Sequence, residues 1–429
     1  MTIETAHEKL AFAAPFAAAE SREATAGRLG YLSGSPRVST RADAETTGAR
    51  AHILGTIGGF EAHGWRVERY VVGDMVPRAW TRKGSQQAIS KSLPRRLAAD
   101  AARIVLARRN ARRAHRALAG RVDLVYERFG AFQALGAAFR RDGVPWILET
   151  NGPLFHEAKV ERRSLALSGL AKRMERAAYR DCDLLVCVSD DLREIIVDAC
   201  GVSRDKVVVI PNGVDTAFHD PASYAPRRLF PGFTVGFVGN LYAWAAVDLL
   251  LDAVADLRRE GVAVHVTVVG DGLTRERLEA QVRALELGDR IAFVGRVERA
   301  EVPPYVAGFD VGYSGQVSSQ LGRMYHSPLK IYEYLAMATP VVASAFADAR
   351  RATGDGATGW LFAPGDRAGL VAALRRAHEA HAAGDVLPRM GRLARETVVA
   401  HHGWPARVEM LIERARRLLP GRLPPGGAG

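Results

Sequence analysis

The stretch SPLKIYEYLAMATPVVA, residues 327–343, decides the fold. A proline beside its start, followed by a run rich in Leu, Ile, Tyr and Ala, predicts a helix that begins near Pro328. The apolar residues after Pro340 predict a short buried strand. A helix that leads directly into a buried strand is typical of a βαβ unit in a parallel sheet.

Two charged residues, Lys330 and Glu333, lie near the start of this helix. The first N–H groups of a helix have no acceptor within it, and with the positive end of the helix dipole they favour an anion such as a diphosphate. Glu333 shares a helix face with Leu329 and Lys330, where its carboxylate can accept hydrogen bonds from both vicinal hydroxyls of a ribose. An ordinary surface pair between Lys330 and Glu333 is the alternative.

The same alternation of short apolar runs and longer helical segments continues along most of the chain, which predicts the α/β class. Ligands of such sheets bind along the carboxyl edge of the strands. The expected strands lie near residues 28–33, 65–72, 124–128, 146–149, 184–189, 206–210, 234–239, 263–269, 290–294, 311–313 and 340–343.

The length of 429 residues, 48% of them hydrophobic, exceeds what one core usually holds. We therefore expect two Rossmann-like domains that face each other across a cleft. The segment PNGVD, residues 211–215, and the prolines after it place the boundary near residue 222. The expected parts are a disordered extension over 1–27, a first domain over 28–222, a second domain over 223–403, a terminal helix over 404–419 that returns to the first domain, and a disordered tail over 420–429.

Four motifs resemble glycosyltransferase family 4, the retaining enzymes of GT-B architecture. They are residues 327–343, the Gly239-Asn240-Leu241 loop, VGDG at 269–272 and PNGVD at 211–215, and they occur in the family's order. The resemblance covers roughly residues 28–418. It implies that the second domain binds a nucleoside-diphosphate sugar and the first an acceptor. It also implies transfer with retention of configuration, without a metal ion and without a further cofactor.

Carried over by position, the resemblance implies a set of donor-binding residues. Glu333 matches the second Glu of the family's Glu-x7-Glu motif and would hold the ribose, while the segment from Ser327 to Lys330 would meet the diphosphate. Arg296 lies where the family lines the nucleobase pocket, and Gly48 matches a loop that approaches the phosphates. The donor residues expected are Gly48, Gly239, Asn240, Arg296, Arg323, Tyr325, His326, Ser327, Pro328, Leu329, Lys330 and Glu333.

The sequence departs from the family at two catalytic places. Tyr325 replaces the first Glu of Glu-x7-Glu, so we expect Tyr325, His326 and nearby backbone to recognise the donor sugar. Asn240 and Ala245 stand where many relatives carry a basic pair that neutralises the leaving diphosphate. We nominate Lys330 for this role, with Arg323 and Arg50 as secondary candidates. A weakened or inactive enzyme is the alternative.

In the first half, the strand over 146–149 ends in polar residues. Glu149 and Asn151 match a Glu-x-Asn-x-Pro pattern found in a subset of relatives. We expect both to lie in the cleft and, together with Lys330, to be the catalytic residues. The alternative is a structural carboxylate at Glu149 and a turn-forming Asn151. His156 is expected on the surface.

The composition limits the classes of partner. Cys182, Cys187 and Cys200 lack the spacing of a zinc site or a disulfide framework, and no other cluster has metal-ligand spacing, so we expect no metal. A net charge of +12 favours anionic partners. The basic residues lack interleaved aromatics, which argues against nucleic acid.

One basic stretch, residues 81–121, holds twelve Lys and Arg residues and a single acid. We expect a helix there with Leu97, Ala101, Ile104 and Val105 on its apolar face. Such a helix would dock weakly on an anionic membrane or bind a phosphorylated acceptor; a solvated helix without a partner is the alternative. No apolar run approaches the length of a membrane span, so the expected location is cytoplasmic, with peripheral attachment to the inner membrane face as the further option.

The function expected from these residues is a metal-independent hexosyltransferase. It would move a sugar from a nucleoside-diphosphate sugar to a nucleophile on a glycan, a lipid carrier or a small metabolite. Two alternatives remain: a nucleotide-sugar epimerase of the same fold, and a non-catalytic protein that binds a nucleotide or polyanion.

Overall fold

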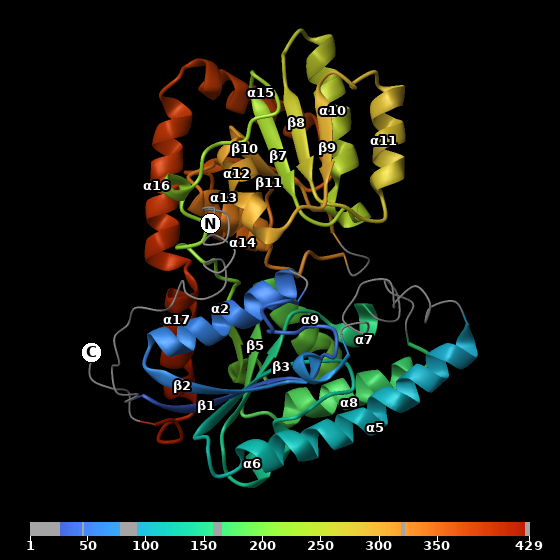
Figure 1. Cartoon of the computed structure of the whole chain (residues 1–429), viewed down its shortest axis with the longest axis vertical. Helices are drawn as coiled ribbons and strands as arrows, with labels where there is room; N and C mark the ends of the chain where they lie inside the picture. The colour runs from blue at the N-terminus through green and yellow to red at the C-terminus, as the bar shows by residue number, and fades with distance from the viewer. Residues whose placement is uncertain (1–25, 45–46, 78–91, 158–164, 319–321, 425–429) are drawn as a thin grey trace, which may run out of the picture. The chain divides into compact units, whose positions relative to one another are not determined.

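The computed structural model describes residues 26–44, 47–77, 92–157, 165–318 and 322–424. The chain forms two compact units. The first combines Met1–Pro211 with Trp404–Gly429, and the second is Asn212–Gly403. Each unit contains one six-stranded parallel sheet with helices packed against it (Figure 1).

The first sheet has the strand order β2-β1-β3-β4-β5-β6. Its strands are β1 (Gly27–Ser33), β2 (Trp65–Val71), β3 (Leu124–Arg128), β4 (Trp146–Thr150), β5 (Leu184–Cys187) and β6 (Val207–Val209). Strands β3 to β6 are almost wholly buried, as expected for a sheet covered on both faces, whereas the edge strand β2 exposes Arg66 and Arg69. The helices of this unit are α2 (Gly48–Ala62), α5 (Leu93–Leu118), α6 (Ala137–Arg141), α7 (Leu154–His156), α8 (Ser168–Asp181), α9 (Asp190–Cys200) and α17 (Trp404–Leu418).

Helix α17, the last of the chain, packs on α2 through two glycines. A Cβ at Gly55 would lie 2.1 Å from Nε1 of Trp404, and one at Gly59 would lie 2.6 Å from a methyl of Val408. The absence of side chains therefore allows the two helices to approach closely. Leu411 of α17 completes the buried core of the first unit.

The second sheet has the strand order β12-β11-β10-β7-β8-β9. Its strands are β7 (Thr234–Val238), β8 (His265–Val269), β9 (Ile291–Gly295), β10 (Val311–Ser314), β11 (Val341–Ser344) and β12 (Gly359–Phe362). The helices are α10 (Val247–Arg259), α11 (Arg275–Ala284), α12 (Val302–Ala307), α13 (Leu329–Ala336), α14 (Ala347–Thr353), α15 (Arg367–Ala382) and α16 (Val386–His401).

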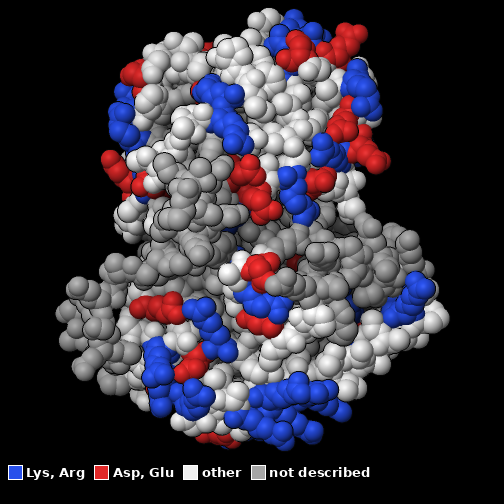
Figure 2. All heavy atoms as spheres, viewed as in Figure 1, with Lys and Arg blue, Asp and Glu red and all other residues white. Residues whose placement is uncertain are grey.

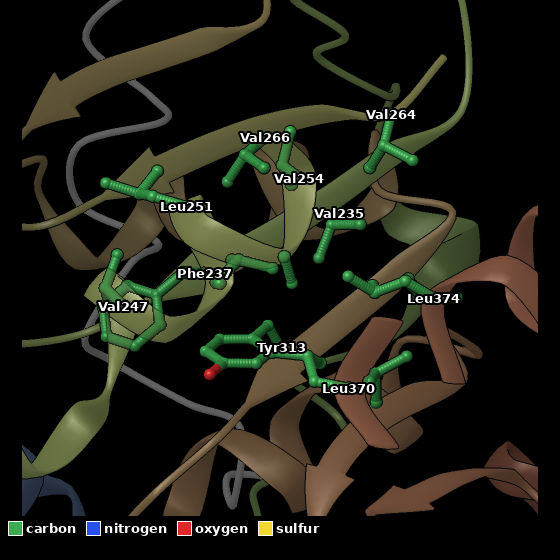
Figure 3. Close-up of a cluster of buried hydrophobic side chains, with 14 of the residues drawn as sticks. Val235, Phe237, Val247, Leu251, Val254, Val264, Val266, Tyr313, Leu370 and Leu374 are labelled. Carbon is green, nitrogen blue, oxygen red and sulfur yellow. The ribbon is translucent and has the colours of Figure 1, made fainter. Parts of the chain in front are cut away.

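The core of the second unit lies between the sheet and helices α10 and α15 (Figure 3). Val235 and Phe237 of β7 point toward Tyr313 of β10, with Leu251 of α10 and Leu374 of α15 around them. Each large apolar side chain buried in this way contributes about 1.5–3 kcal/mol relative to an exposed one. The second sheet is therefore stabilised by a large buried core.

The expected strands all occur, with small shifts at their ends, and one strand was missed. β12 (Gly359–Phe362) has four residues and follows a segment rich in glycine, so it carries no clear period. The units divide after Pro211 rather than near residue 222. The reason is that Val214 pairs with the end of the second unit, donating its N–H to the carbonyl of His402 at 3.1 Å.

Both termini were expected to be disordered, but residues 1–25 and 425–429 lie outside the described residues. Within the described part, β1 begins at Gly27, inside the predicted extension. Arg422 donates to Asp183 at 2.7 Å and Leu423 packs against the first core, so the start of the predicted tail is ordered. No helix in the described ranges combines the length and apolar character needed to cross a membrane.

Candidate functional site

The start of α13 is fixed by a hydrogen-bond network that reaches across the second unit. Asn212 donates from Nδ2 to the carbonyl of Ser327 at 2.6 Å and from its backbone N–H to Ser327 Oγ at 3.0 Å. The Ser327 hydroxyl donates to Asp348 at 2.7 Å, and Tyr332 donates to the other oxygen of Asp348 at 2.7 Å. Ser327 is therefore a positioning residue, and PNGVD and the helix start form one assembly.

Lys330 lies just inside this helix start, against the end of β7. Its Nζ is 3.8 Å from the centroid of the Phe237 ring, and a Cβ at Gly239 would lie 3.2 Å from Nζ. Burial lowers the pKa of Lys330 to about 7, although Glu333 acts in the opposite direction. The amine thus sits beside glycine backbone, with little protein charge nearby to compensate it.

Glu333 lies one turn along α13 and is partly exposed. Its charge opposes the lowering of the Lys330 pKa by burial, so the ordinary pair between the two residues stays an alternative. Burial lowers the pKa of His219, and the charge of Glu333 opposes that shift. Arg299 lies 3.8 Å from the Phe218 ring and reaches Asp215 at 3.5 Å. The PNGVD motif, through Asp215, therefore also orders the polar residues Arg299 and His219 near Glu333.

Two loops meet backbone to backbone at the carboxyl edge of the second sheet. Gly239 follows β7 with φ of +140°, and Gly270 follows β8 with φ of +135°. A Cβ at Gly270 would lie 1.9 Å from the carbonyl oxygen of Gly239. Only glycine fits this approach without strain. The absence of a side chain at Gly239 also leaves room for Nζ of Lys330.

Aromatic rings occupy the loops where the basic pair of relatives was sought. The rings of Tyr242 and Trp244 stack with centroids 5.9 Å apart, and Trp244 lies 5.5 Å from His326. We call Tyr242, Trp244 and His326 the aromatic row. The next ring, Tyr325, is fully buried. The expectation that Tyr325 meets the donor sugar is therefore wrong for this conformation, because its side chain packs inside the unit.

The structure distributes the remaining donor candidates over both units. Arg296 is exposed directly after β9, and Asn240 and Arg323 are exposed in loops of the second unit. Gly48 starts α2 in the first unit. Arg50 is buried and donates to the carbonyl of Arg41 at 2.9 Å, so it is unsuited to the phosphate role considered for it.

Glu149, the residue before the last of β4, lies inside a buried network of the first unit. Nε2 of His52 lies 2.6 Å from its carboxylate, and both Tyr126 and Asn151 donate hydrogen bonds to it. Burial alone would raise the pKa of Glu149, but His52, Arg128 and Tyr126 outweigh burial and lower it to about 2. Glu149 is 1% exposed, which fits the structural alternative rather than the catalytic one. Its role is to hold His52 and Asn151.

Asn151 is partly exposed at the end of this network, where its side-chain oxygen accepts from Arg128 at 3.1 Å. Of Glu149 and Asn151, it is Asn151 that can reach a ligand.

The three cysteines are buried, and burial raises the pKa of Cys182 to about 12 and that of Cys200 to about 11. No group of three His, Cys, Asp or Glu residues within the described ranges is arranged to hold a metal.

Sequence reasoning missed several residues that shape the site. Asp348 and Tyr332 anchor the helix start, and His219 lies within electrostatic reach of both Glu333 and Arg299. None of them belongs to a motif used above except Tyr332. The aromatic row left a visible signal, because Tyr242 and Trp244 stand between the two positions that lack a basic residue.

Comparisons with known proteins agree with this architecture. Residues 46–218 match the family described as Glycosyltransferase Family 4, and residues 232–380 match Glycosyl transferases group 1. A D-inositol 3-phosphate glycosyltransferase of Kineococcus radiotolerans is 31% identical over 313 residues, covering 64% of this chain and 68% of that protein. Glycogen synthase of Mycobacterium tuberculosis is 28% identical over 279 residues, covering 63% of this chain. The chain spans 65% of the length of that glycogen synthase.

Solved structures show the same fold. Sucrose-phosphate synthase of Thermosynechococcus elongatus superposes with a TM-score of 0.64 at 17% identity, covering 91% of this chain and 98% of that one. HepE of Anabaena, in complex with UDP, has a TM-score of 0.59 at 18% identity, covering 91% of this chain and 100% of that one. Both units thus match glycosyltransferases in sequence and in fold, and the chain belongs to glycosyltransferase family 4, with the GT-B fold.

Proposed function

We propose that this protein transfers a sugar from a nucleoside-diphosphate sugar to a nucleophile on a glycan, a lipid carrier or a small metabolite, with retention of configuration and without a metal ion. The observation that carries the proposal is the start of α13, where no side chain in the described ranges caps the first N–H groups of the helix and Nζ of Lys330 lies beside Gly239. A solved structural neighbour, HepE, is in complex with UDP, which supports a nucleotide ligand.

The residues of the second unit have distinct roles in this proposal. Pro328 has no N–H, so the backbone donors to the diphosphate are Leu329 and Lys330. The ammonium form of Lys330 neutralises the charge that grows on the leaving diphosphate. Glu333 accepts the ribose hydroxyls, and the exposed Arg296 borders the base.

Recognition of the donor sugar falls to the aromatic row. The rings of Trp244 and His326 present flat apolar surface near the residue, Ser327, that precedes the helix start. Such rings favour the C–H face of a pyranose. In relatives, the Glu that Tyr325 replaces here would instead accept hydrogen bonds from the sugar hydroxyls. We assign the acceptor site to the first unit, with Asn151 as its polar contact. The contact of Gly48 with the phosphates stays a prediction.

The proton of the acceptor needs no dedicated base in this scheme. The departing phosphate oxygen takes it on the same face of the sugar, as the family resemblance implies. Glu149 does not serve as that base, because its carboxylate is buried and its low pKa keeps it ionised and paired with His52.

Calorimetric titration with UDP, GDP, ADP and TDP tests the proposal. We expect one nucleotide to bind, and Glu333→Ala to weaken that binding more than tenfold, because two hydrogen bonds to a carboxylate are lost (about 1.5–3 kcal/mol each). Glu396→Ala, an exposed Glu of α16, is the control and should bind normally.

Incubation with the matching sugar nucleotide then separates the reaction classes. Release of the nucleoside diphosphate with a sugar product of unchanged anomeric configuration supports transfer. Conversion into an epimer without any release would identify an epimerase instead. No binding of any of the four nucleotides would overturn the proposed function and leave a polyanion-binding protein.

A further inference from the structure

Helix α5 is the most strongly charged surface element of the first unit. Its 26 residues contain eight arginines and one acid, Asp100. That acid is buried, where it accepts from Arg103 at 2.6 Å and from the N–H groups of Ala166 and Leu167 at 2.8 and 2.9 Å. Its charge is therefore neutralised inside the unit and does not offset the exposed arginines.

The buried stripe of α5 differs from the one expected from the sequence. The helix packs through small and polar residues and a terminal leucine, namely Asp100, Ala107, Asn110, Ala114 and Leu118. Val105, expected on the apolar face, points outward and is 66% exposed. The expectation was wrong because alanines and the Asp100 hydrogen bonds, rather than the larger apolar residues, set the orientation of the helix.

The outward face of α5 consequently mixes cations with large apolar side chains. Six of the exposed residues are arginines: Arg95, Arg108, Arg109, Arg112, Arg113 and Arg116. Four of the twelve exposed large hydrophobic residues of the described chain also lie on this one helix: Leu93, Leu97, Val105 and Leu106. Figure 2 shows blue side chains gathered along the lower edge of the first unit, over the position of α5 in Figure 1.

The position of these residues along the helix is ordered. Successive residues turn by about 100°, so Arg109, Arg112 and Arg116 project within one quadrant opposite the buried stripe. Val105 projects in the same direction one turn earlier. Arginine groups and an aliphatic side chain therefore face one plane. Asp142 is bonded to His115 near the C-terminal end of α5.

We propose that the outward face of α5 binds the surface of an anionic phospholipid bilayer. The arginines pair with lipid phosphates, and Val105 and its apolar neighbours enter the boundary between headgroups and acyl chains. This combination fits a membrane better than a nucleic acid, because α5 carries no aromatic ring to stack on a base and exposes aliphatic surface instead. The inference goes beyond the proposed function and does not depend on it.

Cosedimentation of the full chain with vesicles tests this surface. We expect binding to vesicles that contain phosphatidylglycerol in phosphatidylcholine, no measurable binding to pure phosphatidylcholine, and weaker binding as salt rises. Arg109→Glu with Arg112→Glu should reduce vesicle affinity more than tenfold, since each arginine near an anionic surface contributes about fivefold.

Helix α16 of the second unit supplies matched controls. Arg389→Glu with Arg392→Glu reverses two exposed arginines there, and Val399→Asp changes a valine that is 50% exposed. We expect both control variants to bind vesicles normally, whereas Val105→Asp should bind several-fold more weakly. All variants should keep the wild-type melting temperature and nucleotide affinity, because every changed residue is exposed.

Three outcomes would overturn the proposal. One is the absence of binding to anionic vesicles by the wild-type protein. Another is an equal loss in the α16 and α5 variants, which would mean that net charge alone is responsible. The third is binding of single-stranded RNA that is abolished by the two α5 arginine changes and unaffected by Val105→Asp, which would assign the face to nucleic acid.

Discussion

At the scale of single residues, Lys330 carries the positive charge that the loop after β7 lacks. Asn240 is neutral, and Ala245 is 1% exposed, so a basic side chain would not fit there without repacking. Because burial lowers the pKa of Lys330 to about 7, part of the population is uncharged near neutral pH. An anion bound beside Nζ favours the ammonium form and raises that pKa in the complex.

This coupling predicts a pH-dependent nucleotide affinity. We expect the affinity for the preferred nucleoside diphosphate to be constant below pH 7 and to fall as pH rises above 7, by up to about tenfold per pH unit, because binding must then take up a proton. The second pKa of a terminal phosphate is about 6, so above pH 7 that group is almost fully ionised and adds little to the trend. Calorimetry from pH 6 to pH 9 measures it.

Lys330→Met should bind weakly at every pH and lose the trend, while Lys206→Met in the first unit should keep it. A wild-type affinity that does not change with pH would contradict the role assigned to Lys330.

The same pKa shift affects folding stability. Between pH 7 and the ordinary lysine pKa of 10.5, the folded state binds fewer protons than the unfolded state. The contribution of Lys330 to stability therefore rises with pH in that window.

The carboxylate of Glu149 predicts a stability that also rises with pH, but at the acid end of the scale. Its pKa is lowered from 4.5 to about 2 in the folded state, so its contribution to stability is complete above pH 4.5 and is lost as pH falls toward 2. Glu149→Gln removes the buried charge that accepts from Tyr126 and should cost about 1.5–3 kcal/mol of unfolding free energy at pH 7. Urea denaturation measures the change.

Glu409→Gln, an exposed position on α17, is the matched control and should change stability by less than about 0.5 kcal/mol. Glu149→Gln should still bind nucleotide. If the variant kept full stability and lost all transferase activity, Glu149 would be catalytic, and the structural role assigned to it would be wrong.

At the scale of elements, the site depends on loops that approach each other without side chains. The loops after β7 and β8 meet at Gly239 and Gly270, and Gly272 continues the contact beside the carbonyl of Leu241. Asn212 and Asp348 then hold α13 over this edge from either side. The chemistry of Lys330 thus rests on backbone geometry set by two strands and two loops.

Gly270→Ala tests that dependence. The added Cβ would lie 1.9 Å from the Gly239 carbonyl oxygen in a conformation with φ of +135°, so one of the loops must move. We expect a loss of about 3 kcal/mol or more in stability and of nucleotide binding. Gly288→Ala, where the Cβ meets nothing within 4 Å, is the control. Normal nucleotide binding by Gly270→Ala would show that the loop contact is dispensable.

Elements with a strong local period could be predicted from the sequence, and side-chain partnerships could not. Eleven strands followed from runs such as Val235–Val238 because their residues share one buried environment, whereas four-residue β12 did not. The roles assigned to Lys330 and Glu333 rest on helix-end physics and stay predictions. Asp348 is an ordinary acid in the sequence, and only folding brings it to Ser327. The orientation of α5 and the burial of Tyr325 likewise depend on packing partners far away in the chain.

At the scale of the whole molecule, the two units differ in how the chain builds them. The second is one continuous segment, Asn212–Gly403, with its own core. The first needs two segments, because α17 returns to pack on α2 and contributes Val408, Leu411 and Ile412 to the buried cluster. Removing α17 would expose that apolar surface.

A chain that ends at Gly403 should therefore lose the first unit and keep the second. We expect peptides from β1 to β6 to exchange amide hydrogens rapidly, while peptides from β7 to β12 stay protected. Hydrogen exchange followed by mass spectrometry measures both at once. Full protection of β1 in the shortened chain would mean that α17 is not required. A chain shortened only after Leu423 provides the control, because α17 stays whole.

The late return of α17 also has a consequence for biosynthesis. The ribosome releases the strands of the first unit early, yet the groove on α2 formed by Gly55 and Gly59 stays vacant until the final helix leaves the exit tunnel. The continuous second unit has no such wait and can mature first, although its codons are read later. Loss of the codons for α17 would therefore damage the unit whose strands are all encoded upstream of them.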